Sequence, residues 1–211
     1  MAKKTSSYNT IKLFAGVVLL LVAVVGLLYG SMLREMSRAA NDYRQGDAEG
    51  ALKRYETVEQ RLRSFGAMRI IPARDRQDLL LNEARLLYTL ARYDEAGERL
   101  DRETEIAGLI SDGRFLLLRG NIAFRKAIIN FSESPFREVS VLEEQLLAAE
   151  DTLRDSLRLN PDDWDTKYNY EFINYVRKQL TEGDEGDMKL LMENVRIKDI
   201  PPQALSPEQQ K

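Results

Sequence analysis

Carboxylates are the side chains in this sequence whose spacing comes closest to a chemical site. One acidic group comprises Asp162, Asp163 and Asp165, and another comprises Glu182, Asp184, Glu185 and Asp187. Neither group matches a calcium-binding loop, in which oxygen ligands alternate along the chain and a distant glutamate closes the site. We therefore expect turn and capping residues here rather than metal ligands, with Asp163 as a helix N-cap.

The residue types that carry most protein chemistry are missing. The 211 residues contain no cysteine and no histidine, which excludes disulfides, thiolate nucleophiles, Ser-His arrangements and nearly every zinc site. A carboxylate pair in a cleft between helices could still support hydrolysis, but most acids fall in expected turns or on polar helix faces. The sequence therefore predicts no enzyme, no catalytic residue, no cofactor and no metal.

A long apolar segment near the N-terminus predicts a membrane anchor. Residues 13–33 carry no charge, and a helix of that length crosses a hydrocarbon layer of about 30 Å. Lys3, Lys4 and Lys12 precede the segment and favour a cytoplasmic N-terminus, although Arg34 and further arginines follow it. A cleaved signal peptide is the alternative, but "LLYGSMLREM" offers no small-residue cleavage site. An uncleaved single span is favoured.

The remainder of the chain predicts an all-α domain. Apolar residues recur at three and four positions in 79–100 and 141–159, and short breaks at 44–50, 91–96, 132–135 and 160–163 separate the helical stretches. Short breaks imply antiparallel neighbours. At "SESP", Ser134 is expected to cap a helix that begins at Pro135. The net charge of −3 and the lack of a basic stripe argue against nucleic acid as a partner.

Two stretches, "NDYRQGDAEGALKRYETV" and "ARLLYTLARYDEAGERL", repeat one helix–turn–helix pattern, and there the chain resembles tetratricopeptide (TPR) repeats. The resemblance implies a right-handed stack of antiparallel helix pairs, estimated as three pairs and a cap. Small residues would lie where the two helices of a pair cross. These are Ala39, Ala84 and Gly120 in the first helices, and Ala51, Ala96 and Ala149 in the second. Pro161 matches the closing proline of a repeat, after which a capping helix begins at Trp164.

The spacing departs from that family. Ala51 and Ala96 are 45 residues apart, and Ala96 and Ala149 are 53 apart, against a repeat of about 34. The extra length lies in 64–76 and 126–145. The predicted organisation is a cytoplasmic tail (1–12), a transmembrane helix (13–33), a TPR-like domain (34–182), and a flexible C-terminal tail (183–211) in which 188–195 could form a short amphipathic helix.

The TPR resemblance also implies a concave groove that binds peptides. Aromatic and arginine side chains on the first helices predict a groove for an extended or acidic peptide. The candidate residues are Tyr43, Arg44, Arg85, Tyr88, Asn121, Phe124, Arg125 and Tyr168. The alternative is that the aromatic side chains are core residues, as such stripes often are. In the capping helix, Trp164, Tyr168 and Tyr175 are expected to seal the last repeat, with a ligand platform as the alternative.

The segment "LNPDDWDTKYNYEF" resembles repeat ends in single-span TPR proteins that accompany MoxR-type ATPases and von Willebrand-type proteins in bacteria, and in the MxaK-like proteins of methanol-oxidation systems. That likeness implies a scaffold in the inner membrane, with a periplasmic domain that binds partner proteins during maturation of an envelope complex. An accessory factor of protein export has the same layout and is the alternative. Co-purification with translocon subunits rather than an ATPase complex would separate the two.

Overall fold

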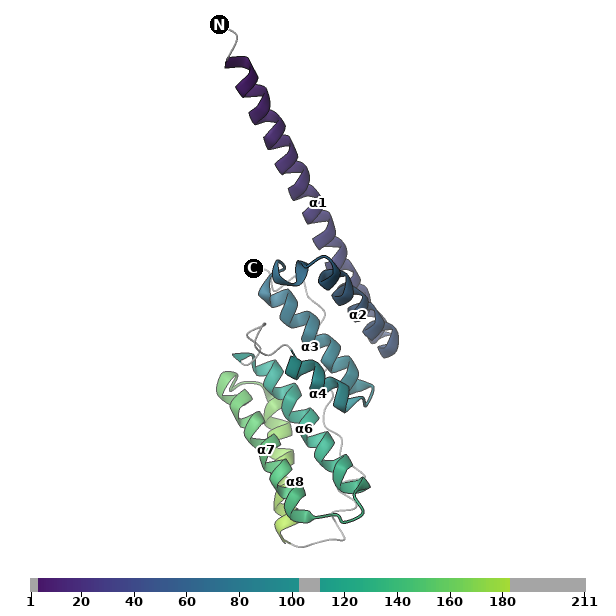
Figure 1. Cartoon of the computed structure of the whole chain (residues 1–211). Coiled ribbons are helices and arrows are strands. Elements are labelled where there is room, and N and C mark those ends of the chain that lie inside the picture. Colours follow the sequence, from purple (N-terminus) through teal and green to yellow (C-terminus); the bar gives the residue numbers. More distant parts are fainter. Residues whose placement is uncertain (1–3, 103–110, 183–211) are drawn as a thin grey trace.

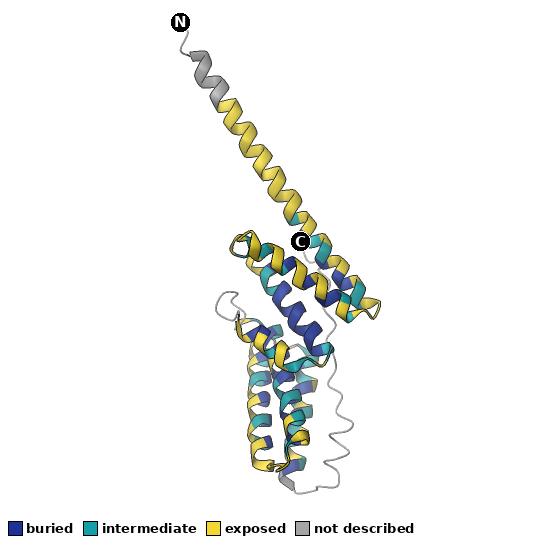
Figure 2. Ribbon diagram, turned by 45° about the vertical axis from the view of Figure 1, so that its right-hand side comes forward, coloured by how far each residue is buried: buried dark blue, intermediate teal, exposed yellow. Residues whose placement is uncertain are grey.

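The structure, a computed structural model, describes residues 4–102 and 111–182. This part of the chain is all-helical and contains no strand. Its first helix, α1 (Lys4–Arg44), is 41 residues long and stands out from the remaining helices (Figure 1). Residues 11–28 of α1 are exposed along their whole length, whereas Met32, Met36 and Ala39 are buried (Figure 2). α1 is therefore long and apolar enough to cross a membrane, and its last turns belong to the helical domain.

The other helices follow one another as antiparallel pairs. They are α2 (Ala48–Ser64), the short 3₁₀ helix η1 (Ala67–Arg69), α3 (Ala73–Thr89), α4 (Tyr93–Arg102), α6 (Gly113–Glu133), α7 (Val139–Leu159) and α8 (Trp164–Glu182). Apart from η1, which packs on α2, each helix contacts the next helix in this series, and α6 also contacts α3 and α8. The predicted tail 183–211, including 188–195, lies outside the described residues.

The turns between α1 and α2 and between α3 and α4 are built in the same way, with a glycine at the left-handed position in one and an alanine in the other. Gly46 follows α1 with φ +90°, and Ala91 follows α3 with φ +58°. In both, a backbone N–H returns to the preceding helix: Asp47 N donates to Asp42 O at 3.0 Å, and Arg92 N donates to Leu87 O at 2.9 Å. These bonds satisfy carbonyls that a helix end leaves open, so each pair closes tightly.

The six small residues expected at the helix crossings are all buried. Ala39, Ala51, Ala84, Ala96 and Ala149 are each fully buried. Gly120 is buried as well, and a Cβ there would meet Leu153 Cδ2 at 2.7 Å. The hydrophobic core consists of two clusters. The first is built from α1, α2, α3, α4 and the first half of α6, and the second from α6, α7 and α8. Burial of all six predicted small residues is thus confirmed.

The expected helix start after "SESP" is wrong. Ser134 is the C-cap of α6, and its N–H donates to Asn130 O at 3.0 Å. α7 begins only at Val139, and Phe136 in the connection is 83% exposed. The expected cap before α8 is confirmed, because the Asp163 carboxylate accepts the N–H of Asp165 at 3.2 Å and the hydroxyl of Thr166 at 2.5 Å.

Candidate functional site

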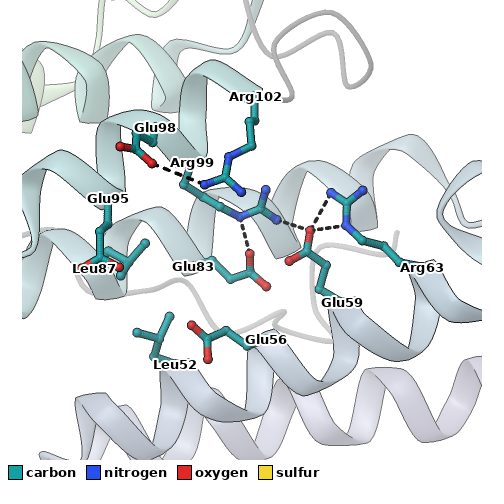
Figure 3. A pocket seen from close by; sticks show the side chains of 10 residues that line it. All are labelled: Leu52, Glu56, Glu59, Arg63, Glu83, Leu87, Glu95, Glu98, Arg99 and Arg102. Carbon is teal, nitrogen blue, oxygen red and sulfur yellow. Dashed lines mark hydrogen bonds and ion pairs between the residues drawn. The ribbon is translucent and has the colours of Figure 1, made fainter.

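A pocket of about 410 Å³ opens between α2, α3 and α4 (Figure 3). Leu52 and Leu87 are its apolar lining residues, and charged side chains make up the rest. These are Glu56, Glu59, Glu83, Glu95, Glu98, Arg63, Arg99 and Arg102. Five glutamates therefore face three arginines, and the lining carries an excess of carboxylates.

Arg99 links the three helices at the back of this pocket. Its Nε donates to Glu83 Oε2 at 2.6 Å, and its Nη2 donates to Glu59 Oε1 at 2.5 Å. Arg63 donates to the same Glu59 oxygen at 2.7 Å. Arg99 is 8% exposed and Glu83 only 2%, so this network is held out of solvent and joins α2, α3 and α4.

Two carboxylates in the pocket are incompletely paired. Glu83 Oε1 is buried and has no hydrogen-bond partner among the described residues. Burial raises the pKa of the Glu83 carboxyl to about 8, and the nearby charge of Arg99 opposes that rise. Glu56, on the exposed face of α2, makes no hydrogen bond or ion pair within the described part of the chain, and it lines the same pocket as Glu83 (Figure 3). Its negative charge adds to the rise in the pKa of Glu83.

This arrangement is suited to holding a cationic group. Glu83 Oε1 is a buried oxygen without a donor, and an ammonium or guanidinium entering the pocket would supply that donor and favour the ionised form of Glu83, whose pKa burial otherwise raises to about 8. The described residues contain no group of three or more side chains able to hold a metal ion, so a metal site is not indicated there. The two leucines would contact the aliphatic stem of a lysine or arginine.

A second pocket, of about 320 Å³, occupies the corresponding place between α4, α6 and α7. Its charged lining residues are Asp101, Arg119 and Lys126, and they include no excess of carboxylates. Arg119 pairs with Asp101 at 3.4 Å, and Lys126 pairs with Asp94 at 2.7 Å. The two pockets share a position in the helix stack, but of these two only the first has a lining with more carboxylates than basic groups.

The side chains of the predicted groove lie mostly inside the domain. Phe124 is fully buried, and Tyr88, Arg85 and Asn121 are 2 to 5% exposed. Phe124 and Tyr88 are therefore core residues, which was the alternative to a peptide-binding groove, and no open groove exists at these two positions. Tyr43 and Arg125 are half-buried, and Arg44 and Tyr168 are exposed; partner binding by these four stays a prediction.

Several of these residues nevertheless meet across successive helices. Arg125 Nε donates to Tyr88 OH at 3.3 Å, which joins α6 to α3. Asn169 Nδ2 donates to Asn121 Oδ1 at 2.9 Å, which joins α8 to α6. Burial and the adjacent charge of Arg114 lower the pKa of Arg85 to about 10, so the guanidinium stays charged at neutral pH. The predicted face is thus mainly a helix-to-helix interface.

The expectation that Trp164, Tyr168 and Tyr175 seal the last repeat is wrong. These side chains are 76%, 52% and 50% exposed, and the buried face of α8 is formed by other residues, Ile173 and Val176 among them. Sequence reasoning also missed the Glu83 pocket, because its glutamates lie on three helices. The available signal was Glu83 itself, an acidic residue in the leucine-rich run "LLLNEARLLY".

Comparison with known proteins finds no family model, no curated protein and no solved structure that matches this chain. The resemblance to TPR proteins therefore stays a prediction from the residues.

Proposed function

We propose that this protein is a membrane-anchored helical-repeat adaptor that holds a partner protein through the pocket between α2, α3 and α4. The observation that carries the proposal is the unpartnered, buried Glu83 oxygen beside Glu56 in an open pocket with excess carboxylates. The partner group that fits is a lysine or arginine side chain. The protein is proposed to bind rather than to catalyse.

The architecture supports a TPR-like stack. Three successive pairs, α1–α2, α3–α4 and α6–α7, are followed by the single helix α8. Small residues are buried where each pair crosses, and pockets recur between consecutive second helices. Stacked helix pairs of this kind present extended surfaces whose usual role is protein binding.

The layout favours a bacterial envelope location for the adaptor. α1 is proposed to cross the inner membrane once, with the N-terminus in the cytoplasm and the helical domain in the periplasm. The partners suggested by sequence resemblance are a MoxR-type ATPase complex or von Willebrand-type envelope proteins. The adaptor would then act in assembly or maturation of such a complex.

The proposal is tested by affinity purification of the full chain from detergent-solubilised membranes, with bound proteins identified by mass spectrometry. Glu56→Lys reverses the charge at the exposed rim of the pocket without disturbing the Arg99 network. Glu144→Lys on α7 is the matched control, because Glu144 is also exposed but lies outside the pocket. Both variants should keep the helical circular dichroism of the parent protein.

We expect one envelope partner to be captured by the parent protein and by Glu144→Lys, and to be lost from Glu56→Lys. Equal capture by both variants would show that the pocket is not the docking point. Capture of translocon subunits would favour the export alternative over a maturation complex. If the folded parent protein captures no protein at all, the adaptor proposal is wrong.

A further inference from the structure

The connection between α2 and α3, residues 65–72, exposes large apolar side chains. Phe65 is 82% exposed and Ile70 is 78% exposed, whereas Met68 and Ile71 are half-buried against the core. Gly66, with φ +64°, turns the chain directly after α2, and Arg76 Nη1 donates to Met68 O at 3.0 Å. The connection is thus tied to the domain while Phe65 and Ile70 are exposed.

The same stretch is strongly basic. Residues 61–76 contain five arginines and one acid, Asp75, in a chain whose net charge is −3. Arg61, Arg63, Arg69 and Arg74 are exposed. Exposed apolar side chains combined with clustered arginines are the composition of a segment that lies in a membrane interface, where anionic phosphates attract the arginines.

Packing against α1 sets the height of this connection relative to the apolar span. The Tyr29 hydroxyl donates to Asp75 Oδ2, which holds the start of α3 against α1 within the uncharged stretch 13–33. The Tyr55 hydroxyl donates to Met36 O at 3.4 Å, which ties α2 to the buried last turns of α1.

The hydrogen bond between Tyr29 and Asp75 places the start of α3, which directly follows the connection, at the height of Tyr29. Tyr29 precedes Leu33, the last residue of the uncharged stretch, by four residues, or about 6 Å of helix. Interfacial apolar groups lie about 5–10 Å into the boundary between headgroups and acyl chains, which agrees with this depth. Figures 1 and 2 both show the α2–α3 connection as the part of the helical domain nearest the N-terminal half of α1.

We propose that the α2–α3 connection is a second membrane contact, which inserts Phe65 and Ile70 into the leaflet from which α1 emerges and sets Arg69 and Arg74 against its anionic headgroups. This inference rests on the proposed span of α1. A bilayer is favoured over a protein as the occupant, because the span that would lie in it belongs to the same chain and fixes the depth. With two contacts, the helical domain has one defined orientation on the membrane.

Tryptophan fluorescence in the full chain tests this contact. Trp164 is the single tryptophan, so Trp164→Phe supplies a silent background. A tryptophan is then introduced by F65W in the connection, by L19W within the span, or by F136W at the α6–α7 connection. Phe136 is the matched control, since it is a phenylalanine of equal exposure, 83%, at the far end of the domain. Each protein is reconstituted into phosphatidylcholine–phosphatidylglycerol vesicles with brominated acyl chains, which quench nearby indoles.

We expect F65W to lose emission to the bromines nearly as strongly as L19W and to show a blue shift, and F136W to show neither change. Arg69→Glu with Arg74→Glu should weaken the quenching of F65W in these anionic vesicles. Quenching of L19W without quenching of F65W would overturn the second contact and leave the span intact. If L19W is not quenched either, the span and the contact are both wrong. Unchanged quenching after the double charge reversal would overturn the assigned role of the arginines.

Discussion

Replacement of Gly120 by alanine tests whether close packing at a helix crossing requires a small residue. A Cβ at this position would lie 2.7 Å from Leu153 Cδ2, 2.8 Å from Leu153 Cγ and 3.4 Å from Ala149 O. Leu153 is fully buried, so its side chain has no open space to move into. Alanine in a helix interior gains about 1 kcal/mol over glycine, and overpacking costs about 1–3 kcal/mol. The net effect should be a loss of about 1 kcal/mol.

Gly97 supplies the matched control for this substitution. It lies within α4, and a Cβ there would meet its nearest neighbour, Ile122 Cγ2, at an ordinary 3.7 Å. Gly97→Ala should therefore stabilise the protein by about 0.5–1 kcal/mol through helix propensity alone. Urea unfolding of the full chain in detergent, followed by circular dichroism, gives the free energy of unfolding for both variants.

A double-mutant cycle with Leu153→Ala separates the clash from other effects. That change alone should cost about 2–5 kcal/mol by leaving a cavity. In its background Gly120→Ala should become stabilising, since the atoms it would strike are gone, and the coupling should exceed about 1 kcal/mol. If Gly120→Ala stabilises the parent protein as much as Gly97→Ala does, the close approach of α6 and α7 does not exist as described.

Two further predictions concern burial. The pKa of Glu83 is about 8 in the folded protein against an ordinary 4.5, so the folded state binds more protons than the unfolded state between these values. Stability should therefore fall as pH rises from about 5 to about 8, and Glu83→Gln should flatten that dependence in urea titrations; an unchanged slope would refute the shift. Phe124→Ala should cost about 3–5 kcal/mol, whereas Trp164→Ala, at a 76% exposed position, should change stability by less than about 0.5 kcal/mol; equal losses in thermal melts would contradict the assignment of α8's faces.

Features set by local chemistry could be predicted from the sequence. At the first turn, Gly46 adopts a positive φ and the Asp47 carboxylate caps α2 by accepting the Gly50 N–H at 2.8 Å. Asp163 likewise caps α8 with its carboxylate. The buried small residues could also be predicted, because close helix crossings exclude large side chains. In contrast, α7 begins at Val139 rather than at Pro135, since tertiary packing rather than capping preference decides that end.

The charged pocket could not be predicted, because its geometry depends on how three helices pack. In the sequence, Glu59 and Glu95 each belong to a polar helix face like that of any solvent-exposed helix. Only the packing of the helices pairs Glu59 with Arg99 and places Glu95 in the lining of the same pocket. The exposure of Trp164 could not be predicted for a related reason. Helical spacing shows which residues share a face, but it does not show whether that face packs against another helix.

The pocket and the α2–α3 connection are adjacent, and this constrains where a partner can bind. Arg63 lines the pocket near the C-terminal end of α2, and Phe65 follows it by two residues. A membrane contact at Phe65 therefore brings the Arg63 end of the pocket close to the headgroups. Glu56 precedes Phe65 by nine residues, or about 13 Å of helix, so a partner whose basic side chain reaches Glu56 and Glu83 would bind near the membrane surface, where anionic lipids attract the same basic side chain. Such a geometry selects a partner whose basic residues lie next to its own membrane segment, and disfavours a freely diffusing one.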